Sequence, residues 1–247
     1  MQQKKTFSIG GVHPPENKLT ADMAIVDVAL PKQVAIPVSQ HIGKPADVVV
    51  ERGSEVKVGT LLATAAGFIS APVHSSVSGK VKKIDTVVDA QGYRRQAVLI
   101  TVDGDEWDEE IDADPQLIST IAHDAATIVQ RIADGGIVGA GGATFPTAVK
   151  FSIPEGKNVD TLLINGVECE PYLTADDRLM LENADELIVG TRILMKAIAV
   201  KRAWIGIEGN KPDAIEHLSE RLSELSAAGE IPEGTIEVLP LRVKYPQ

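Results

Sequence analysis

The spacing of apolar residues changes once along the chain, and this change predicts two kinds of structure. From about residue 31 to 102, short runs such as "ADVVVERGSEVKVGTLLATAAG" alternate apolar and polar residues and are interrupted by glycines. This period of two is typical of half-buried β-strands. Beyond residue 115, strand-like runs alternate with stretches of helical periodicity. We therefore expect an all-β domain followed by an α/β domain, whose strands form a parallel sheet.

The second half of the chain has recognisable helix and strand limits. Asp114 and Pro115 resemble an N-cap and a first helical position, and Gly135 resembles the stop of the same helix. The further elements that the pattern predicts are strands over 159–165, 203–208 and 235–241 and helices over about 175–200 and 212–228.

Four segments follow from these patterns. The prolines of "HPPEN" exclude a helix near the N-terminus, so residues 1–30 are predicted to be an extended arm. Residues 31–102 form the predicted barrel-sandwich domain. Residues 103–114 contain eight acids and no base, which is typical of a solvated linker. Residues 115–247 form the predicted α/β domain.

Composition excludes several classes of function. The net charge of −11 and the lack of a basic patch argue against nucleic-acid binding. The single cysteine, Cys169, cannot form an internal disulfide or supply the four thiolates that an iron–sulfur cluster normally needs. The five histidines are too scattered to predict a metal site. No uncharged apolar run approaches the ~20 residues of a membrane-spanning helix.

A glycine-rich loop lies between the first predicted helix and the first α/β strand. The segment "IADGGIVGAGGATFPTAVKF" places five glycines between Gly135 and Gly142. It matches neither the dinucleotide fingerprint, because Thr144 stands where a third glycine is needed, nor a P-loop. Glycines let a backbone approach a flat ring or a phosphate, and Lys150 could supply a cation. A binding loop and a structural connection both remain open.

Two carboxylates follow the first predicted strand of the α/β domain. In "LLINGVECEPYLTADDRLM" the strand ends at Asn165, and Glu168 and Glu170 come next. Ligands of open α/β sheets bind at the carboxyl ends of the strands, which favours a site here. The alternative is that the acids only solvate a loop. Asp176 or Asp177 is a candidate cap for the following helix.

The β-rich segment resembles the biotinyl/lipoyl barrel-sandwich fold through its "VKVGTLLATAAG" and "SAPVHSSVSGKV" stretches. Carrier members of that fold hold their swinging arm on a lysine at a hairpin tip. This chain has no lysine between Lys57 and Lys80, where the tip would lie. A structural or docking role is therefore expected instead of a carrier role.

Five motifs extend the resemblance over nearly the whole chain. "GGVHPPENK", "PVSQHIG", "FISAPVHSSVSGKV", "GGIVGAGGATFPTAVK" and "INGVECEPYLTADDR" are similar to segments of RnfC, a component of the Rnf electron-transport complex. The last two motifs also resemble, more distantly, the flavin-bearing, NADH-oxidising subunit of respiratory complex I. The resemblance implies that the α/β domain is a Rossmann-like domain that binds FMN and NADH.

The resemblance also implies roles for individual residues. The glycines of the loop would lie against the flavin and nicotinamide rings, with Phe145 on the dinucleotide side and Lys150 near anionic groups. Asn165 would hydrogen-bond the flavin, while Glu168 and Glu170 would face the reacting rings. Val167 stands where the complex I motif has an aspartate, so one polar contact is lost. The implied cofactor-binding glycines are Gly139, Gly141 and Gly142.

At the level of the whole complex, the resemblance implies FMN-mediated electron exchange between NADH and ferredoxin-linked iron–sulfur centres, coupled to ion transport. The other Rnf subunits, including membrane subunits, would be the partners, at the cytoplasmic side of the bacterial inner membrane. Members of the family carry two iron–sulfur clusters in a region beyond the part matched here, so this chain is expected to be a shortened form. The alternatives are a docking fragment that is inactive alone and a related cobalamin reductase.

Overall fold

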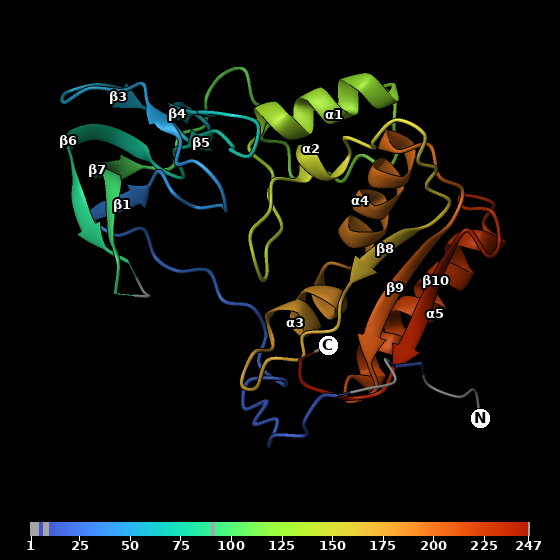
Figure 1. The fold of residues 1–247 in the computed structure, drawn as a ribbon. Helices are drawn as coiled ribbons and strands as arrows, with labels where there is room; N and C mark the ends of the chain where they lie inside the picture. The colour runs from blue at the N-terminus through green and yellow to red at the C-terminus, as the bar shows by residue number, and fades with distance from the viewer. Residues whose placement is uncertain (1–4, 7–9, 90–91, 247) are drawn as a thin grey trace. The chain divides into compact units, whose positions relative to one another are not determined.

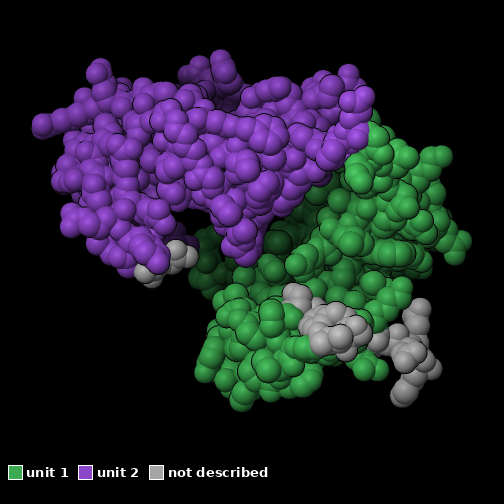
Figure 2. All heavy atoms as spheres, in the orientation of Figure 1, with its two compact units in different colours: residues 1–27, 117–122, 156–247 green, residues 28–116, 123–155 purple. Residues whose placement is uncertain are grey.

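The computed structural model describes residues 5–6, 10–89 and 92–246, and it divides the chain into two compact units (Figures 1 and 2). Unit 1 contains residues 1–27, 117–122 and 156–247, and unit 2 contains residues 28–116 and 123–155. The predicted arm belongs to unit 1 up to residue 27, and its residues 1–4 and 7–9 lie outside the described residues. The same holds for residues 90–91 of the barrel and for the last residue, 247.

Unit 2 is built on two antiparallel sheets, as the alternating pattern predicts (Figure 1). One sheet has the order β1-β7-β6-β3 and the other β2-β4-β5. β7 is central in the first sheet, and its residues Ala97, Val98 and Ile100 are fully buried. The strands are β1 (Gln33–Pro37), β2 (Asp47–Val48), β3 (Glu55–Val56), β4 (Leu61–Thr64), β5 (Val73–His74), β6 (Ser78–Val88) and β7 (Arg94–Gly104).

The acidic run is attached to the barrel in its first part. Trp107 forms a parallel bridge with Val58, and Lys57 forms an ion pair with Glu106 at 2.7 Å. Backbone and charge contacts thus tie the segment after β7 to the β3 region. Residues 103–116 group with unit 2, so the first part of the segment predicted as a linker has structural contacts of its own.

The first helix begins later than the sequence predicts. α1 spans Ala125–Asp134, and its N-cap is Asp124, whose side chain accepts a hydrogen bond from the Thr127 N–H at 2.8 Å. The predicted cap at Asp114 is therefore wrong. Residues 117–122 instead group with unit 1, where the Lys196 ammonium donates to the Ile121 carbonyl at 2.7 Å. The predicted end at Gly135 is confirmed.

Unit 1 contains the parallel sheet that the strand–helix alternation predicts (Figure 1). The order is β10-β9-β8, with strands at Leu162–Asn165 (β8), Ala203–Glu208 (β9) and Ile236–Leu241 (β10). The helices of this unit are α3 (Ala175–Glu182), α4 (Ala184–Ala197) and α5 (Pro212–Ala227). They bury one apolar cluster against the sheet, with Met180, Ile188, Ile205, Ile207 and Leu218 at its centre. The single helix predicted over 175–200 is two helices, because Asn183 leaves the helical conformation.

The N-terminal arm lies along unit 1 without forming a helix, as its prolines predict. Val12 pairs with Tyr245 in an antiparallel bridge, and Lys5 pairs with Leu241 at the end of β10. Within the described residues, no helix is both long enough and apolar enough to cross a membrane.

Candidate functional site

The glycine-rich loop of unit 2 is a closed, hairpin-like turn. Val138 and Pro146 form an antiparallel bridge, and the Gly139 N–H donates to the Phe145 carbonyl at 3.0 Å. At the tip, the Thr144 N–H donates to the Gly141 carbonyl at 3.3 Å. Gly142 adopts a φ of 58°, a left-handed conformation that glycine adopts without steric cost. The loop therefore has a defined shape held by its own backbone.

The tip of this loop presents unpaired donors. In the part of the chain that the structure describes, the N–H groups of residues 140–143 have no hydrogen-bond acceptor. A Cβ atom built on Gly141 or Gly142 would meet no atom within 4 Å. Free N–H groups beside open space are what an anion or a flat ring requires. This geometry favours a binding loop over a structural connection.

The first two glycines of the run have structural uses. Gly135 closes α1, and its N–H donates to the Arg131 carbonyl at 2.9 Å. Gly136 adopts a φ of 65°, and a Cβ atom there would lie 2.3 Å from the Pro72 carbonyl oxygen. The five glycines thus divide into two that the fold needs, Gly141 and Gly142 that leave space open, and Gly139.

Lys150 lies beside the third glycine. It is the exposed last residue of the short helix α2 (Thr147–Lys150), and its Nζ would lie 3.0 Å from a Cβ atom on Gly139. Phe145 is half-buried, and its carbonyl closes the loop. The structure thus brings together the predicted residues of unit 2: Gly139, Gly141, Gly142, Phe145 and Lys150.

The other predicted residues lie on the turn that follows β8 in unit 1. The Asn165 side-chain oxygen accepts a hydrogen bond from the Val167 N–H at 3.1 Å, which bends the chain directly after the strand. Glu168 and Tyr172 adopt positive φ angles of 45° and 70°. Such angles are uncommon for residues other than glycine, so the surrounding contacts must hold the turn.

The two carboxylates of this turn have different surroundings. The Glu168 carboxylate accepts hydrogen bonds from the N–H groups of Asp176 at 2.7 Å and of Asp177 at 3.3 Å. It therefore caps α3, and the prediction that Asp176 or Asp177 caps this helix is wrong. The Glu170 side chain is exposed, and its hydrogen bond with the Tyr245 hydroxyl raises the pKa of that tyrosine.

Two lysines bind the carbonyls of the turn, and the sequence did not indicate them. The Lys18 ammonium donates to the carbonyls of Glu168, Glu170 and Leu173. The Lys211 ammonium donates to the Val167 carbonyl at 2.8 Å and lies 3.4 Å from the Glu168 carbonyl. Lys18 and Lys211 lie far from the turn in the sequence, so no local pattern identifies them.

Lys211 is buried together with carboxylates. Its side chain is 3% exposed, and burial, with the nearby Lys18 charge, lowers the pKa of its ammonium. Asp177 is also buried, and burial, followed by repulsion from Asp213, raises the pKa of its carboxyl group. Its Oδ1 atom has no hydrogen-bond partner in the described part of the chain. Buried charges of this kind are expensive, and they cluster at functional sites more often than elsewhere.

A small cavity of about 170 Å³ lies at the carboxyl end of the sheet in unit 1. Three separate segments close around it: the arm, the turn after β8 and the chain that follows β10. The buried Glu208 carboxylate, at the end of β9, accepts a hydrogen bond from the Lys244 N–H at 2.8 Å. The residues that line the cavity include His13, Cys169, Glu208, Asn210 and Tyr245.

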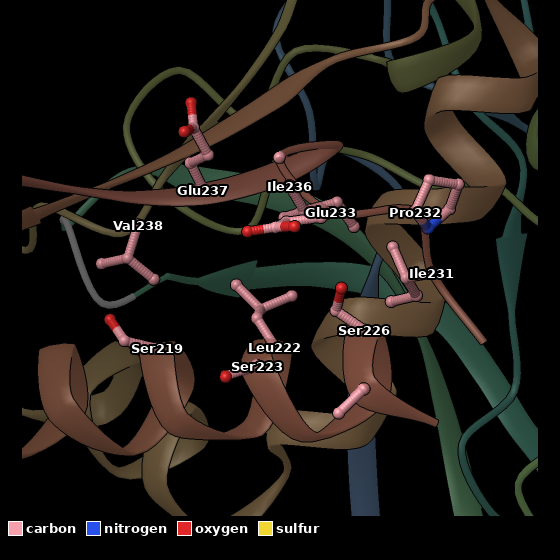
Figure 3. Close-up of a pocket in the computed structure, with 12 residues that line it drawn as sticks. Ser219, Leu222, Ser223, Ser226, Ile231, Pro232, Glu233, Ile236, Glu237 and Val238 are labelled. Atoms are coloured by element: carbon pink, nitrogen blue, oxygen red, sulfur yellow. The ribbon is translucent and has the colours of Figure 1, made fainter. Parts of the chain in front are cut away.

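The larger groove, of about 590 Å³, lies at the opposite edge of the sheet (Figure 3). Its residues come from the last turns of α5 and from the start of β10, where Ile236 and Val238 face Leu222. Ligands of open α/β sheets bind at the carboxyl ends of the strands and not at the amino ends. Size alone therefore does not make this groove the candidate site.

Two family models match the chain, one in each half. Residues 5–105 match the RnfC barrel sandwich hybrid domain, and residues 132–247 match the Nuo51 FMN-binding domain. The order of an all-β domain before an α/β domain is confirmed. The second match contains both the glycine-rich loop and the turn after β8.

Curated relatives carry the same two regions. The RnfC-type component of the proton-translocating ferredoxin:NAD(+) oxidoreductase complex of Clostridium ljungdahlii is 44% identical over 241 residues, which cover 96% of this chain and 50% of the relative. Its counterpart in the Na(+)-translocating complex of Acetobacterium woodii is 41% identical over 96% of this chain and 52% of the relative. The counterpart in the ion-translocating oxidoreductase complex of Rhodobacter capsulatus is 41% identical, over 87% of this chain and 42% of the relative. The chain thus spans about half the length of these relatives, and it belongs to the RnfC family of ion-translocating ferredoxin:NAD(+) oxidoreductase complexes.

Proposed function

We propose that this chain is the flavin-binding part of the RnfC component of an Rnf-type complex. In that role it takes part in FMN-mediated electron exchange between NADH and ferredoxin-linked iron–sulfur centres, coupled to ion transport. Relatives named as components of ferredoxin:NAD(+) oxidoreductase complexes support the reaction class. We further propose that the protein is peripheral, on the cytoplasmic side of the membrane, with the other Rnf subunits as partners.

The observation that carries the proposal is the tip of the glycine-rich loop. Its N–H groups at residues 140–143 are unpaired among the described residues, and Gly141 and Gly142 leave open space beside them. We propose that Gly139, Gly141 and Gly142 lie against the planar rings of FMN and the nicotinamide. Lys150 supplies positive charge to anionic groups of these ligands, and Phe145 supplies an apolar edge. Bound FMN would accept a hydride and release electrons one at a time.

The turn after β8 is proposed to contribute polar groups. The Asn165 side-chain oxygen is used by the Val167 N–H, so its amide nitrogen is the group that would donate to the flavin. Glu168 and Glu170 are proposed to face the reacting rings. Glu168 would do so while its carboxylate caps α3, whereas the exposed Glu170 has more freedom to move.

An anaerobic titration tests this function. FMN is added to the chain while the flavin fluorescence is recorded, and NADH is then added while the flavin absorbance is followed. We expect saturable quenching at one FMN per chain, followed by bleaching of the flavin band by NADH. Saturable FMN binding without bleaching would limit the chain to cofactor binding, and no saturable binding would contradict the proposal.

A docking role for the barrel is a second proposal. Phe68, between β4 and β5, is 73% exposed, and no lysine is present in this region to carry a swinging arm. We expect Phe68→Ser to reduce co-purification of the chain with the other Rnf subunits, whereas Val88→Ser, at another exposed apolar residue, leaves it unchanged. Equal co-purification of both variants and the wild type would contradict this role.

A further inference from the structure

The contacts of Lys18 concern the turn after β8 almost entirely. Its Nζ donates to the carbonyl oxygens of Glu168 at 2.9 Å, Glu170 at 3.0 Å and Leu173 at 2.6 Å. A lysine ammonium has three N–H donors, and all three are accounted for by this one turn. The side chain is only half-buried, so its role is not explained by apolar packing.

The arm around Lys18 is fixed to the same region on both sides. The Tyr172 N–H donates to the Glu16 carbonyl at 2.9 Å, and the hydroxyls of Thr20 and Thr174 lie 2.6 Å apart. Further along, Glu182 accepts a hydrogen bond from the Ile25 N–H at 3.1 Å. These contacts hold the Lys18 backbone in place, so that the ammonium remains at the turn.

The turn needs such support because its backbone is strained. Glu168 and Tyr172 have left-handed backbone angles, and each such residue costs on the order of 1–3 kcal/mol unless its surroundings compensate. Lys18 binds the carbonyl of Glu168 and the two carbonyls of Glu170 and Leu173 that flank Tyr172. Lys211 reaches only the first part of the turn, at Val167 and Glu168. The second part therefore depends on Lys18.

We propose that Lys18 is a positioning residue for the turn that carries Asn165, Glu168 and Glu170. It acts through the carbonyls of the turn and fixes the directions in which these side chains point, so that docking of the N-terminal arm and binding of the flavin are coupled. The inference rests on the proposed function for its flavin part, whereas its structural part concerns the ligand-free chain alone.

Hydrogen exchange and FMN titration of Lys18→Met test the two parts separately. Without FMN, we expect the amides of residues 172–177 to exchange at least tenfold faster than in the wild type, while those of β9 are unchanged. The dissociation constant for FMN is expected to rise about tenfold. Lys18→Arg keeps the charge but presents a planar guanidinium, so we expect it to recover part of both effects. Lys201→Met, at an exposed lysine of the same unit, is the matched control.

Each outcome bears on a different claim. Unchanged exchange in Lys18→Met would overturn the inference, as would an arginine variant no better than the methionine variant. Faster exchange with an unchanged FMN dissociation constant would overturn the coupling to the flavin. Absence of FMN binding by the wild type would contradict the proposed function and the flavin part of the inference, while the exchange data would still decide whether Lys18 holds the turn.

Discussion

The glycine-rich loop and the turn after β8 present their backbones in opposite ways. The tip of the loop has N–H groups without acceptors among the described residues and glycines that contact nothing. The turn has its carbonyls bound by Lys18 and Lys211, and one of its carboxylates is used to cap a helix. The loop is thus shaped by what it leaves free, and the turn by the groups that hold it. Substitutions in the two segments should therefore affect different quantities.

The largest effect on stability is expected from Lys211→Met. Removal of the ammonium leaves the buried carboxylates of Asp177 and Glu208 without a buried cation beside them. Breaking a buried pair in this way typically costs about 3–5 kcal/mol, and we expect a loss of this size in the free energy of unfolding of unit 1.

The two tryptophans allow each unit to be followed alone. Trp204 lies on β9 in unit 1, and Trp107 lies in unit 2, so a Trp107→Phe background reports the urea unfolding of unit 1. Lys201→Met is expected to change this transition by less than about 0.5 kcal/mol, as an exposed substitution should. A Lys211→Met transition equal to that of Lys201→Met would show that the buried ammonium does not support the turn.

Within the loop region, two glycines should differ in their effect on stability. Gly136→Ala introduces a Cβ atom 2.3 Å from the Pro72 carbonyl oxygen at a left-handed backbone position, and we expect it to lower the free energy of unfolding of unit 2 by about 1–3 kcal/mol. Gly141→Ala, which meets open space, should change it by less than about 0.5 kcal/mol. Trp107 fluorescence in a Trp204→Phe background measures both. Equal effects would remove the distinction between structural and free glycines.

The capping role of Glu168 predicts a smaller effect. Glu168→Ala removes the acceptor of the first N–H groups of α3, and we expect a loss of about 1 kcal/mol in the stability of unit 1. Glu170→Ala, at the exposed carboxylate, is the matched control and should be close to neutral. If the two variants unfold at the same urea concentration, the helix does not depend on Glu168.

The smallest effect is a change in pH dependence at Asp177. Because burial raises the pKa of its carboxyl group above the ordinary value of 3.8, the folded protein binds this proton more tightly than the unfolded chain. The group therefore lowers stability above its folded pKa, and this cost disappears as the pH falls toward 3.8. We expect Asp177→Asn to be more stable than the wild type at pH 7, with the difference closing near pH 4. Urea unfolding at both pH values measures this, and a constant difference would contradict it.

The parts of the fold that depend on local signals were predictable from the sequence. Strand β9 and helix α5 lie where the apolar pattern places them, because each buries one continuous apolar face. The start of α1 was not predictable in the same way. Asp114–Pro115 and Asp124 are both acceptable starts, and the contacts of residues 117–122 with unit 1 decide between them.

The candidate site divides along the same line. The glycine-rich loop could be found because its chemistry lies in consecutive residues. Lys18 and Lys211 could not be found, because their partners lie 150 and 44 positions away and neither lysine belongs to a local pattern. The capping role of Glu168 was also missed, since the carboxylate reaches the helix from outside the usual N-cap position.

The most direct test of the flavin-binding loop is an FMN titration of the wild type beside Gly141→Val. The valine side chain would occupy the open space at the loop tip without meeting any protein atom near its Cβ position. We expect the wild type to bind FMN saturably and the variant to bind at least 100-fold more weakly, with both unfolding at the same urea concentration. Equal FMN affinity of the two proteins would contradict the claim that the free backbone of this loop holds the flavin.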